Sequence, residues 1–247
     1  MILAAGMGTR LLPLTEHMPK ALLKIQDVPL LQHCIMYFKF FGVNEIIINV
    51  HHLADRITEF LAARNNFGIR IEISHEKEEL LDTGGGLFKA RWFFNDDRPF
   101  FLATSDVITN LNLEQLYQYH LENKPLATLA VKRRQTTREL LFDDKYNLCG
   151  WHNNVTGETR WARSVDHYRQ IAFSTIHVID PVLFDLVTEE GAFSMTDLYL
   201  RLAKDHTIKG FEHDKSLWFE CGRIENLEIL NSRKEIRHIY RHFHTFC

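Results

Sequence analysis

The sequence predicts an α/β protein: a mostly parallel mixed sheet with helices on both faces. Apolar strand-like runs alternate with helical patterns in the first half, which is the signature of a covered parallel sheet. The second half changes to shorter strands of antiparallel type. The chain of 247 residues is 45% hydrophobic and 25% charged, so a mainly disordered protein is excluded. We expect a single domain.

Each element of the first half follows from its hydrophobic pattern. Dense runs of β-branched and apolar residues predict strands at 1–5, 45–50, 69–74, 99–104 and 126–131. Apolar residues at helical spacing predict helices at 29–41, 54–63, 87–94 and 113–122. Pro29 suits the first turn of its helix, Gly42 ends that helix, and Asn112 is a candidate N-cap.

The second half predicts short antiparallel strands and three helical segments. The strands are expected at 140–142, 147–151, 157–160 and 170–178. The helices are expected near 181–187, 195–203 and 224–240. No Pro/Ser-rich linker or repeat separates the halves, which supports the single domain.

Charge and cysteine content limit the class of function. The net charge is 29 − 32 = −3, which argues against a protein whose main task is to hold nucleic acid or an anionic membrane. The four cysteines lie far apart without a CxxC pair, so we expect reduced thiols and a cytoplasmic setting. We expect no membrane span, because no apolar run approaches about 18 residues. We expect no signal peptide, because no basic segment precedes an apolar one at the N-terminus.

The first loop carries the clearest chemical signal. The segment Leu3-Ala-Ala-Gly-Met-Gly-Thr-Arg10 runs from a strand into small residues and a cation, and Pro19-Lys20 follows. Backbone N–H groups of such a loop can hold phosphate oxygens at the carboxyl end of a parallel strand. A Walker loop is excluded because no Gly-Lys-Ser/Thr follows, and a dinucleotide fingerprint is excluded because residue 11 is Leu.

The segment from Leu3 to Lys20 resembles the signature of sugar-1-phosphate nucleotidyltransferases, L-A-A-G-x-G-T-R-L-x-P-L-T followed by P-K. The resemblance implies a Rossmann-like fold of nucleotide-diphospho-sugar transferase type. It also implies that Arg10 and Lys20 are catalytic and contact the phosphates. The residues that the same resemblance assigns to nucleotide binding are Leu3, Ala4, Ala5, Gly6, Gly8 and Thr9.

A second glycine run extends the resemblance. Leu80-Leu-Asp-Thr-Gly-Gly-Gly86 is similar to the loop that binds base and ribose, which assigns Gly84 and Gly85 to the nucleotide. The L-x-T-G-G-G form is typical of the branch with N-acetylmuramate-1-phosphate uridylyltransferases and mannose- or heptose-1-phosphate guanylyltransferases. A planar base needs close backbone approach, which side chains would block.

Two carboxylates are candidate ligands of Mg²⁺. Asp106 ends an apolar strand where the family has its magnesium-binding Asp, and Glu220 lies in a segment that resembles W-x-D-V-G-T. Mg²⁺ prefers one or two protein carboxylates together with phosphates. Glu220 stands where the family has Asp, and Arg223 where it has Thr, so the second ligand is open at this point.

The sugar side is less clearly marked, because the Glu-Lys-Pro motif of many relatives is absent. Trp151, Asn153 and Glu158 are the candidate sugar-binding residues, since an indole face stacks on a sugar ring and polar groups read hydroxyls. A solvated hairpin is the alternative for this segment. Thr175 replaces the Gly of the family strand A-F-x-G-I, which could change the sugar that fits.

Together these residues predict transfer of a nucleotidyl group from a nucleoside triphosphate to a sugar 1-phosphate, with pyrophosphate as the other product. The nucleotide-binding half is expected at about 1–135 and the sugar-binding half at about 136–247. A cytidylyltransferase acting on a phosphorylated alcohol and a catalytically silent nucleotide-sugar-binding regulator are the alternatives. The base, the sugar and the oligomeric state stay open, with a homo-oligomer among the options.

Overall fold

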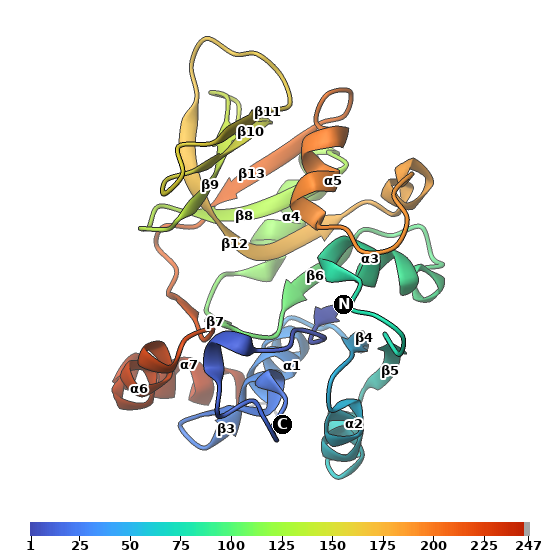
Figure 1. Ribbon diagram of the computed structural model, residues 1–247, viewed down its shortest axis with the longest axis vertical. Helices are drawn as coiled ribbons and strands as arrows, with labels where there is room; N and C mark the ends of the chain where they lie inside the picture. The colour runs from blue at the N-terminus through green and yellow to red at the C-terminus, as the bar shows by residue number, and fades with distance from the viewer. Residues whose placement is uncertain (245–247) are drawn as a thin grey trace. The chain divides into compact units, whose positions relative to one another are not determined.

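The computed structural model describes residues 1–244, which fall into two compact units. The first unit comprises Met1–Leu80, Thr104–Leu111 and the segment from Ser216 onward. The second unit comprises Leu81–Ala103 and Asn112–Lys215. Both combine helices with β-strands (Figure 1). None of the helices described is long and apolar enough to span a bilayer.

The first unit is built on parallel strands in the order β1 (Ile2–Leu3), β4 (Glu45–Val50) and β5 (Arg70–His75). β4 coincides with the strand predicted at 45–50, and all its residues after Glu45 are buried. Helices α1 (Leu30–Phe40) and α2 (Ala54–Ala62) belong to the same unit. β1 is shorter than the predicted 1–5, since the chain leaves the strand after Leu3 to form the first loop.

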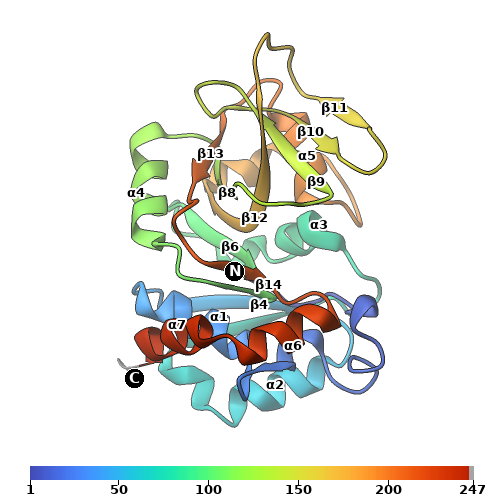
Figure 2. The same cartoon turned by 90° about the vertical axis from the view of Figure 1, so that its left-hand side faces the viewer.

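Two helices follow one another at the end of the first unit, α6 (Ile224–Ser232) and α7 (Lys234–His244) (Figure 2). The single helix predicted at 224–240 is therefore wrong at Arg233, whose extended backbone (φ −77°, ψ 123°) ends α6. α7 packs on α1: the Phe243 ring lies 5.2 Å from that of Tyr37 and 5.0 Å from that of Phe40.

The second unit is built around the long strand β12 (Arg169–Ile179), which pairs antiparallel with three others. These are β6 (Phe100–Thr104), β8 (Ala127–Lys132) and β9 (Arg138–Phe142). β10 (Leu148–Asn153) and β11 (Thr159–Trp161) continue the antiparallel pairing from β9, and β13 (Ile208–Glu212) pairs parallel with β8. The change to antiparallel strands in the second half is thus confirmed, whereas β13 was not predicted.

The helices of the second unit are α3 (Asp82–Lys89), α4 (Leu113–Asn123) and α5 (Met195–Leu202). The Asn112 side chain accepts a hydrogen bond from the N–H of Gln115, so the predicted N-cap of α4 is confirmed. The helix predicted at 87–94 is wrong in its bounds: α3 contains all three glycines. α3 ends at Lys89, and residues 91–93 form a separate 3₁₀ helix after Ala90.

Short elements complete the two units. In the first unit β2 (Lys24–Ile25) pairs with β3 (Val28–Pro29), and β7 (Val107–Thr109) pairs with β14 (Trp218–Glu220). The 3₁₀ helices are η1 (Thr9–Leu11), η2 (Lys20–Leu22), η3 (Asn65–Gly68), η4 (Arg91–Phe93) and η5 (Pro181–Leu186). The helix predicted near 181–187 is therefore a 3₁₀ helix, with Asp180 capping Val182.

Candidate active site

The β7–β14 ribbon of the first unit brings two carboxylates together from distant parts of the sequence. Val107 pairs with Glu220, and the N–H of Cys221 donates to the backbone oxygen of Asp106 at 2.8 Å. The N–H of Ser105 donates to Leu3 at 3.0 Å, which ties the same segment to β1. Asp106 and Glu220 thus lie at neighbouring positions of the ribbon, beside the strand that leads into the first loop.

Lys20 pairs with Asp106. Its ammonium donates a hydrogen bond to Asp106 Oδ2, and each of the two side chains is only 16% exposed. Burial by itself would raise the pKa of Asp106, but the charge and hydrogen bond of Lys20 and a hydrogen bond from Thr104 hold this pKa below its usual value. Asp106 is therefore a carboxylate anion at neutral pH.

Arg10 lies near Glu220 in a looser pair. Arg10 Nη2 is 3.9 Å from Glu220 Oε1, and the two side chains are 60% and 36% exposed. An exposed pair at this distance contributes little to stability, since solvent screens it. Arg10 belongs to η1, so the guanidinium reaches out from the first loop.

Gly222 lies close to three charged groups. A methyl group built on its Cα would come within 2.8 Å of Glu220 Oε1 and within 3.5 Å of both Arg10 Nη2 and Lys20 Nζ. Lys20 in turn pairs with Asp106, so the first unit gathers two cations and two carboxylates in one region. We call Arg10, Lys20, Asp106 and Glu220 the charge cluster.

The charge cluster fits a magnesium ion that shares its ligands with a substrate. Asp106 and Glu220 supply hard oxygen donors, and residue 222, which lies close to Glu220 Oε1, carries no side chain. Within residues 1–244 there is no group of three or more His, Cys, Asp or Glu side chains arranged to hold a metal. Two carboxylates are what Mg²⁺ uses when phosphates and water complete its shell.

The conformation of the first loop is stabilised by contacts with residues outside its motif. Gly8 has φ 67°, and a Cβ there would lie 2.8 Å from Thr15 Cγ2, so this position needs glycine. The Ala4 N–H donates to Asn49 Oδ1 at 2.8 Å, and Asn49 Nδ2 donates to Glu76 at 2.7 Å. Asn49 and Glu76 are buried polar residues, one near the end of β4 and the other directly after β5; a polar residue at the end of an apolar strand is the signal that could have identified them.

The remaining predicted residues of the first loop divide into a buried and an exposed set. Leu3, Ala4 and Ala5 are buried, whereas Gly6 and Thr9 are exposed. A Cβ on Gly6 would meet nothing within 4 Å, so this stretch of backbone is open to an approaching ligand. Their assignment to nucleotide binding stays a prediction.

Gly84 and Gly85, in the second unit, pack against their own unit. Their N–H groups both donate to the Phe193 carbonyl, at 2.8 and 3.2 Å. A Cβ on Gly84 would lie 2.4 Å from the Phe193 ring, and one on Gly85 would lie 2.4 Å from the carbonyl oxygen of Gly191. Close packing of 191–193 is thus one physical reason for these glycines, besides the predicted approach of a base.

The predicted sugar-binding residues all belong to the β10–β11 hairpin of the second unit. The Arg160 guanidinium lies 5.2 Å from the Trp151 ring and also pairs with Asp197. Asn153 Oδ1 accepts from the N–H groups of Val155 and Thr156, so it shapes the turn. Glu158 is exposed. The hairpin brings the three residues near one another in sequence and fold, and their role stays a prediction.

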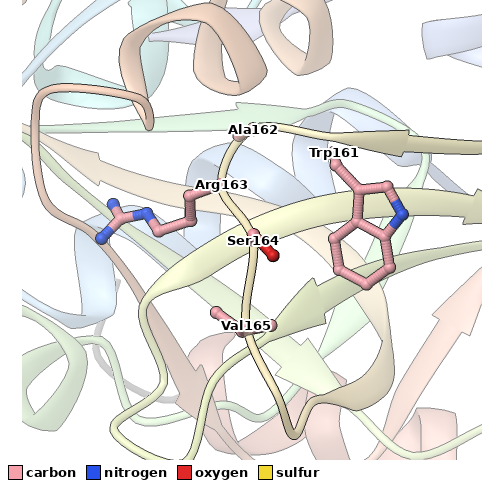
Figure 3. A pocket seen from close by; sticks show the side chains of 5 residues that line it. All are labelled: Trp161, Ala162, Arg163, Ser164 and Val165. Carbon is pink, nitrogen blue, oxygen red and sulfur yellow. The ribbon is translucent and has the colours of Figure 1, made fainter.

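A pocket of about 370 Å³ lies in the second unit at the segment that follows β11 (Figure 3). Its lining residues are Trp161, Ala162, Arg163, Ser164 and Val165. Arg163 is held by the carbonyl oxygens of Ala203 and His206, at 3.0 and 3.3 Å. Trp151, Asn153 and Glu158 do not line this pocket, so it is separate from the predicted sugar residues.

Comparisons with known proteins identify nucleotidyltransferases as relatives. The model of a family described as Nucleotidyl transferase matches residues 1–140. N-acetylmuramate alpha-1-phosphate uridylyltransferase of Caulobacter vibrioides is 28% identical over 234 residues, which is 90% of each chain. Mannose-1-phosphate guanylyltransferase catalytic subunit beta of Xenopus tropicalis is 36% identical over 135 residues, 54% of this chain; the match spans 37% of that relative's length.

Solved structures show the same fold. A UDP-glucose pyrophosphorylase complexed with UDP-glucose superposes with a TM-score of 0.77 and 17% identity, over 97% of both chains. At this identity the likeness is one of fold alone. It confirms the predicted mixed α/β fold with a parallel core.

Proposed function

This chain belongs to the nucleotidyl transferase family, and on that premise we propose that it transfers a nucleotidyl group from a nucleoside triphosphate to a sugar 1-phosphate. Membership confirms the resemblance predicted from the first loop. The products would be a nucleotide sugar and pyrophosphate. The activity and the substrates are proposals, since the match spans 37% of the length of the Xenopus tropicalis relative.

The charge cluster is the observation that supports this reaction. Two anions must approach one another, and their repulsion is the main barrier that the protein has to lower. Arg10 and Lys20 bring two positive charges into the charge cluster, and Arg10 follows directly on the exposed first loop. Fixed charges in a partly dry site stabilise developing negative charge more strongly than water does.

The chemistry requires no general base from the protein. A phosphate monoester has a second pKa near 6, so the attacking sugar phosphate is already an anion at pH 7. In-line displacement at the α-phosphorus then depends on positioning and charge neutralisation. Arg10 offers a forked guanidinium for phosphate oxygens, and Lys20 a compact charge.

Magnesium is the proposed cofactor. Asp106 and Glu220 would hold it, and when bound it would neutralise phosphate charge. Glu220 is one methylene longer than the Asp usual in the family, and its Oε1 reaches to within 2.8 Å of the space above Gly222.

The names of the relatives support two pairs of substrates equally well. The Caulobacter vibrioides relative is named for N-acetylmuramate 1-phosphate and a uridylyl group, and the Xenopus tropicalis relative for mannose 1-phosphate and a guanylyl group. We propose that Trp151, Asn153 and Glu158 lie on the sugar side, in the half at about 136–247 of a single domain. A cytoplasmic setting and self-association stay predictions.

The test is pyrophosphate release from all four nucleoside triphosphates with a panel of sugar 1-phosphates and an alcohol phosphate. We expect turnover with a sugar 1-phosphate and UTP or GTP. Lys20→Ala and Asp106→Ala should each slow turnover by about 10²–10³ while the fold survives. Turnover only with CTP and the alcohol phosphate would identify the cytidylyltransferase. Binding without turnover would identify the silent regulator, and near-normal activity of both variants would refute the site.

A further inference from the structure

Lys20 forms an ion pair with Asp106, the carboxylate that a metal ion would need as a ligand. Its ammonium is hydrogen-bonded to Asp106 Oδ2, and the low exposure of both side chains means that little water competes for that oxygen. Asp106 is the less exposed of the two carboxylates in the charge cluster, at 16% against 36% for Glu220. A cation that enters the cluster must therefore share Asp106 with the ammonium or displace it.

The charge cluster is neutral as it stands. Arg10 and Lys20 contribute two positive charges, which Asp106 and Glu220 balance. A divalent cation that approaches Asp106 meets the ammonium at the same carboxylate, and repulsion between close charges of equal sign is strong where solvent is scarce. Triphosphate brings the opposite change, because its oxygens are alternative partners for Lys20.

We propose that Lys20 holds the metal position on Asp106 while the nucleotide is absent, and that the phosphates of the nucleotide draw Lys20 away and open this position. Metal and nucleotide then bind with positive coupling, and each strengthens the other by the same factor. The part of this proposal that concerns the nucleotide rests on the proposed function. The competition between Lys20 and a metal ion for Asp106 does not, since it concerns an ion pair within this chain.

The first experiment measures metal binding without nucleotide. Mn²⁺ serves as the probe, and the electron paramagnetic resonance signal of the free ion reports its binding to the full chain. Lys20→Met should bind Mn²⁺ about 5- to 150-fold more tightly than the native protein, the usual range of coupling between two sites. Asp106→Asn should bind it more weakly. Lys24→Met, which removes an exposed lysine of β2, should match the native protein.

Unchanged or weaker binding by a folded Lys20→Met would overturn the competition. The native protein gives a second measurement that needs no variant of Lys20. Acylation of lysines, read by mass spectrometry, should increase at Lys20 when Mn²⁺ is added at a concentration that saturates the native protein, and should stay constant at Lys24. Equal labelling of Lys20 with and without Mn²⁺ would contradict the proposal.

A separate experiment tests the part of the proposal that concerns the nucleotide. A non-hydrolysable triphosphate should tighten Mn²⁺ binding to the native protein, and Lys20→Met should lose most of this increase. An equal increase in both proteins would overturn the transfer of Lys20 to the phosphates. Failure of the proposed function looks different: the native protein would show no turnover with any substrate pair, while Lys20→Met would still bind Mn²⁺ more tightly.

Discussion

At the scale of single residues, Gly222 shows how a missing side chain shapes a site. The ends of three charged side chains surround the position that its Cβ would take. These ends belong to flexible side chains, which can move aside at small cost to stability. A substitution here therefore tests the arrangement of the charges more than the fold.

Gly222→Ala should lower kcat/KM by about tenfold to a hundredfold, because misplacement of reacting groups by about 1 Å has effects of this size. The free energy of unfolding should change by less than about 1 kcal/mol. Steady-state kinetics and urea unfolding measure the two quantities. Full activity of Gly222→Ala would show that the space above residue 222 is not used.

Thr175 is a second residue whose backbone is informative. It has φ 58° inside β12, where the pairing with β8 shifts register between Phe173 and His177. A β-branched residue is strained in this left-handed region. The family motif has glycine here, which would adopt the same backbone freely.

Thr175→Gly should be more stable than Thr175→Ala by about 1 kcal/mol, because both lose the hydroxyl but only glycine loses the Cβ strain. Thr159 of β11, whose φ is not positive, is the matched control: there the alanine variant should be the more stable one. Chemical denaturation of the four variants measures this. If alanine were favoured at both positions, the strain at Thr175 would be disproved.

The motif residues of the charge cluster could be chosen from the sequence, because each lies in a segment that resembles a motif of the family. The structure brings Arg10, Lys20, Asp106 and Glu220 together in one unit. The surroundings of Gly222 and the role of Asn49 could not be predicted in this way. Both depend on contacts with residues far along the chain, although Gly222 itself lies in the segment that resembles W-x-D-V-G-T.

At the scale of elements, α3 shows a helix that contains three glycines and still forms. Glycine costs about 1 kcal/mol relative to alanine within a helix, so the sequence favours a helix that starts after the run. Tertiary contacts reverse this preference. The Phe193 carbonyl accepts hydrogen bonds from Gly84 and Gly85, and the Thr83 hydroxyl accepts one from the N–H of Met195.

Gly84→Ala should reduce the free energy of unfolding by about 1–2 kcal/mol, because overpacking against the Phe193 ring outweighs the better helix propensity of alanine. In a Phe193→Ala background the same substitution should cost at least about 1 kcal/mol less, a coupling that a double-mutant cycle measures. Additive effects of the two substitutions would argue against the contact.

Long, strongly patterned elements were predictable and short ones were not. β4 and α1 carry dense apolar residues over most of their length, so local pattern and burial agree. β13 reads Ile-Lys-Gly-Phe-Glu, and β14 and β7 have only three residues each. Such short segments become strands because they pair with another strand, and the local sequence does not predict this pairing.

At the scale of the whole molecule, three buried histidines tie stability to pH. Burial lowers the pKa of His120 to about 4, of His177 to about 3 and of His213 to about 4. Each ring has a hydroxyl partner: Thr128 at 3.0 Å, Tyr199 at 2.7 Å and Ser174 at 2.8 Å, in the same order. The folded protein thus keeps these rings neutral.

The protein should lose stability as the pH falls from about 6.5 toward 4. In this window the unfolded chain binds protons at these histidines and the folded protein does not, so each contributes a loss of up to about 1.4 kcal/mol per pH unit. Urea unfolding between pH 7 and pH 5 measures the slope. His177→Gln should reduce the slope by about a third, and a slope unaffected by this change would contradict the assignment.

The β7–β14 ribbon also constrains when the charge cluster can form during synthesis of the chain. A ribosome that has translated up to Lys215 has already made Arg10, Lys20 and Asp106, but not the strand that pairs with β7. The larger part of the second unit, Asn112–Lys215, lies between the two strands of the ribbon in the sequence. Until residues 218–220 emerge, the ribbon cannot place Glu220 near Asp106, so the charge cluster is completed late in synthesis, after the second unit has been made.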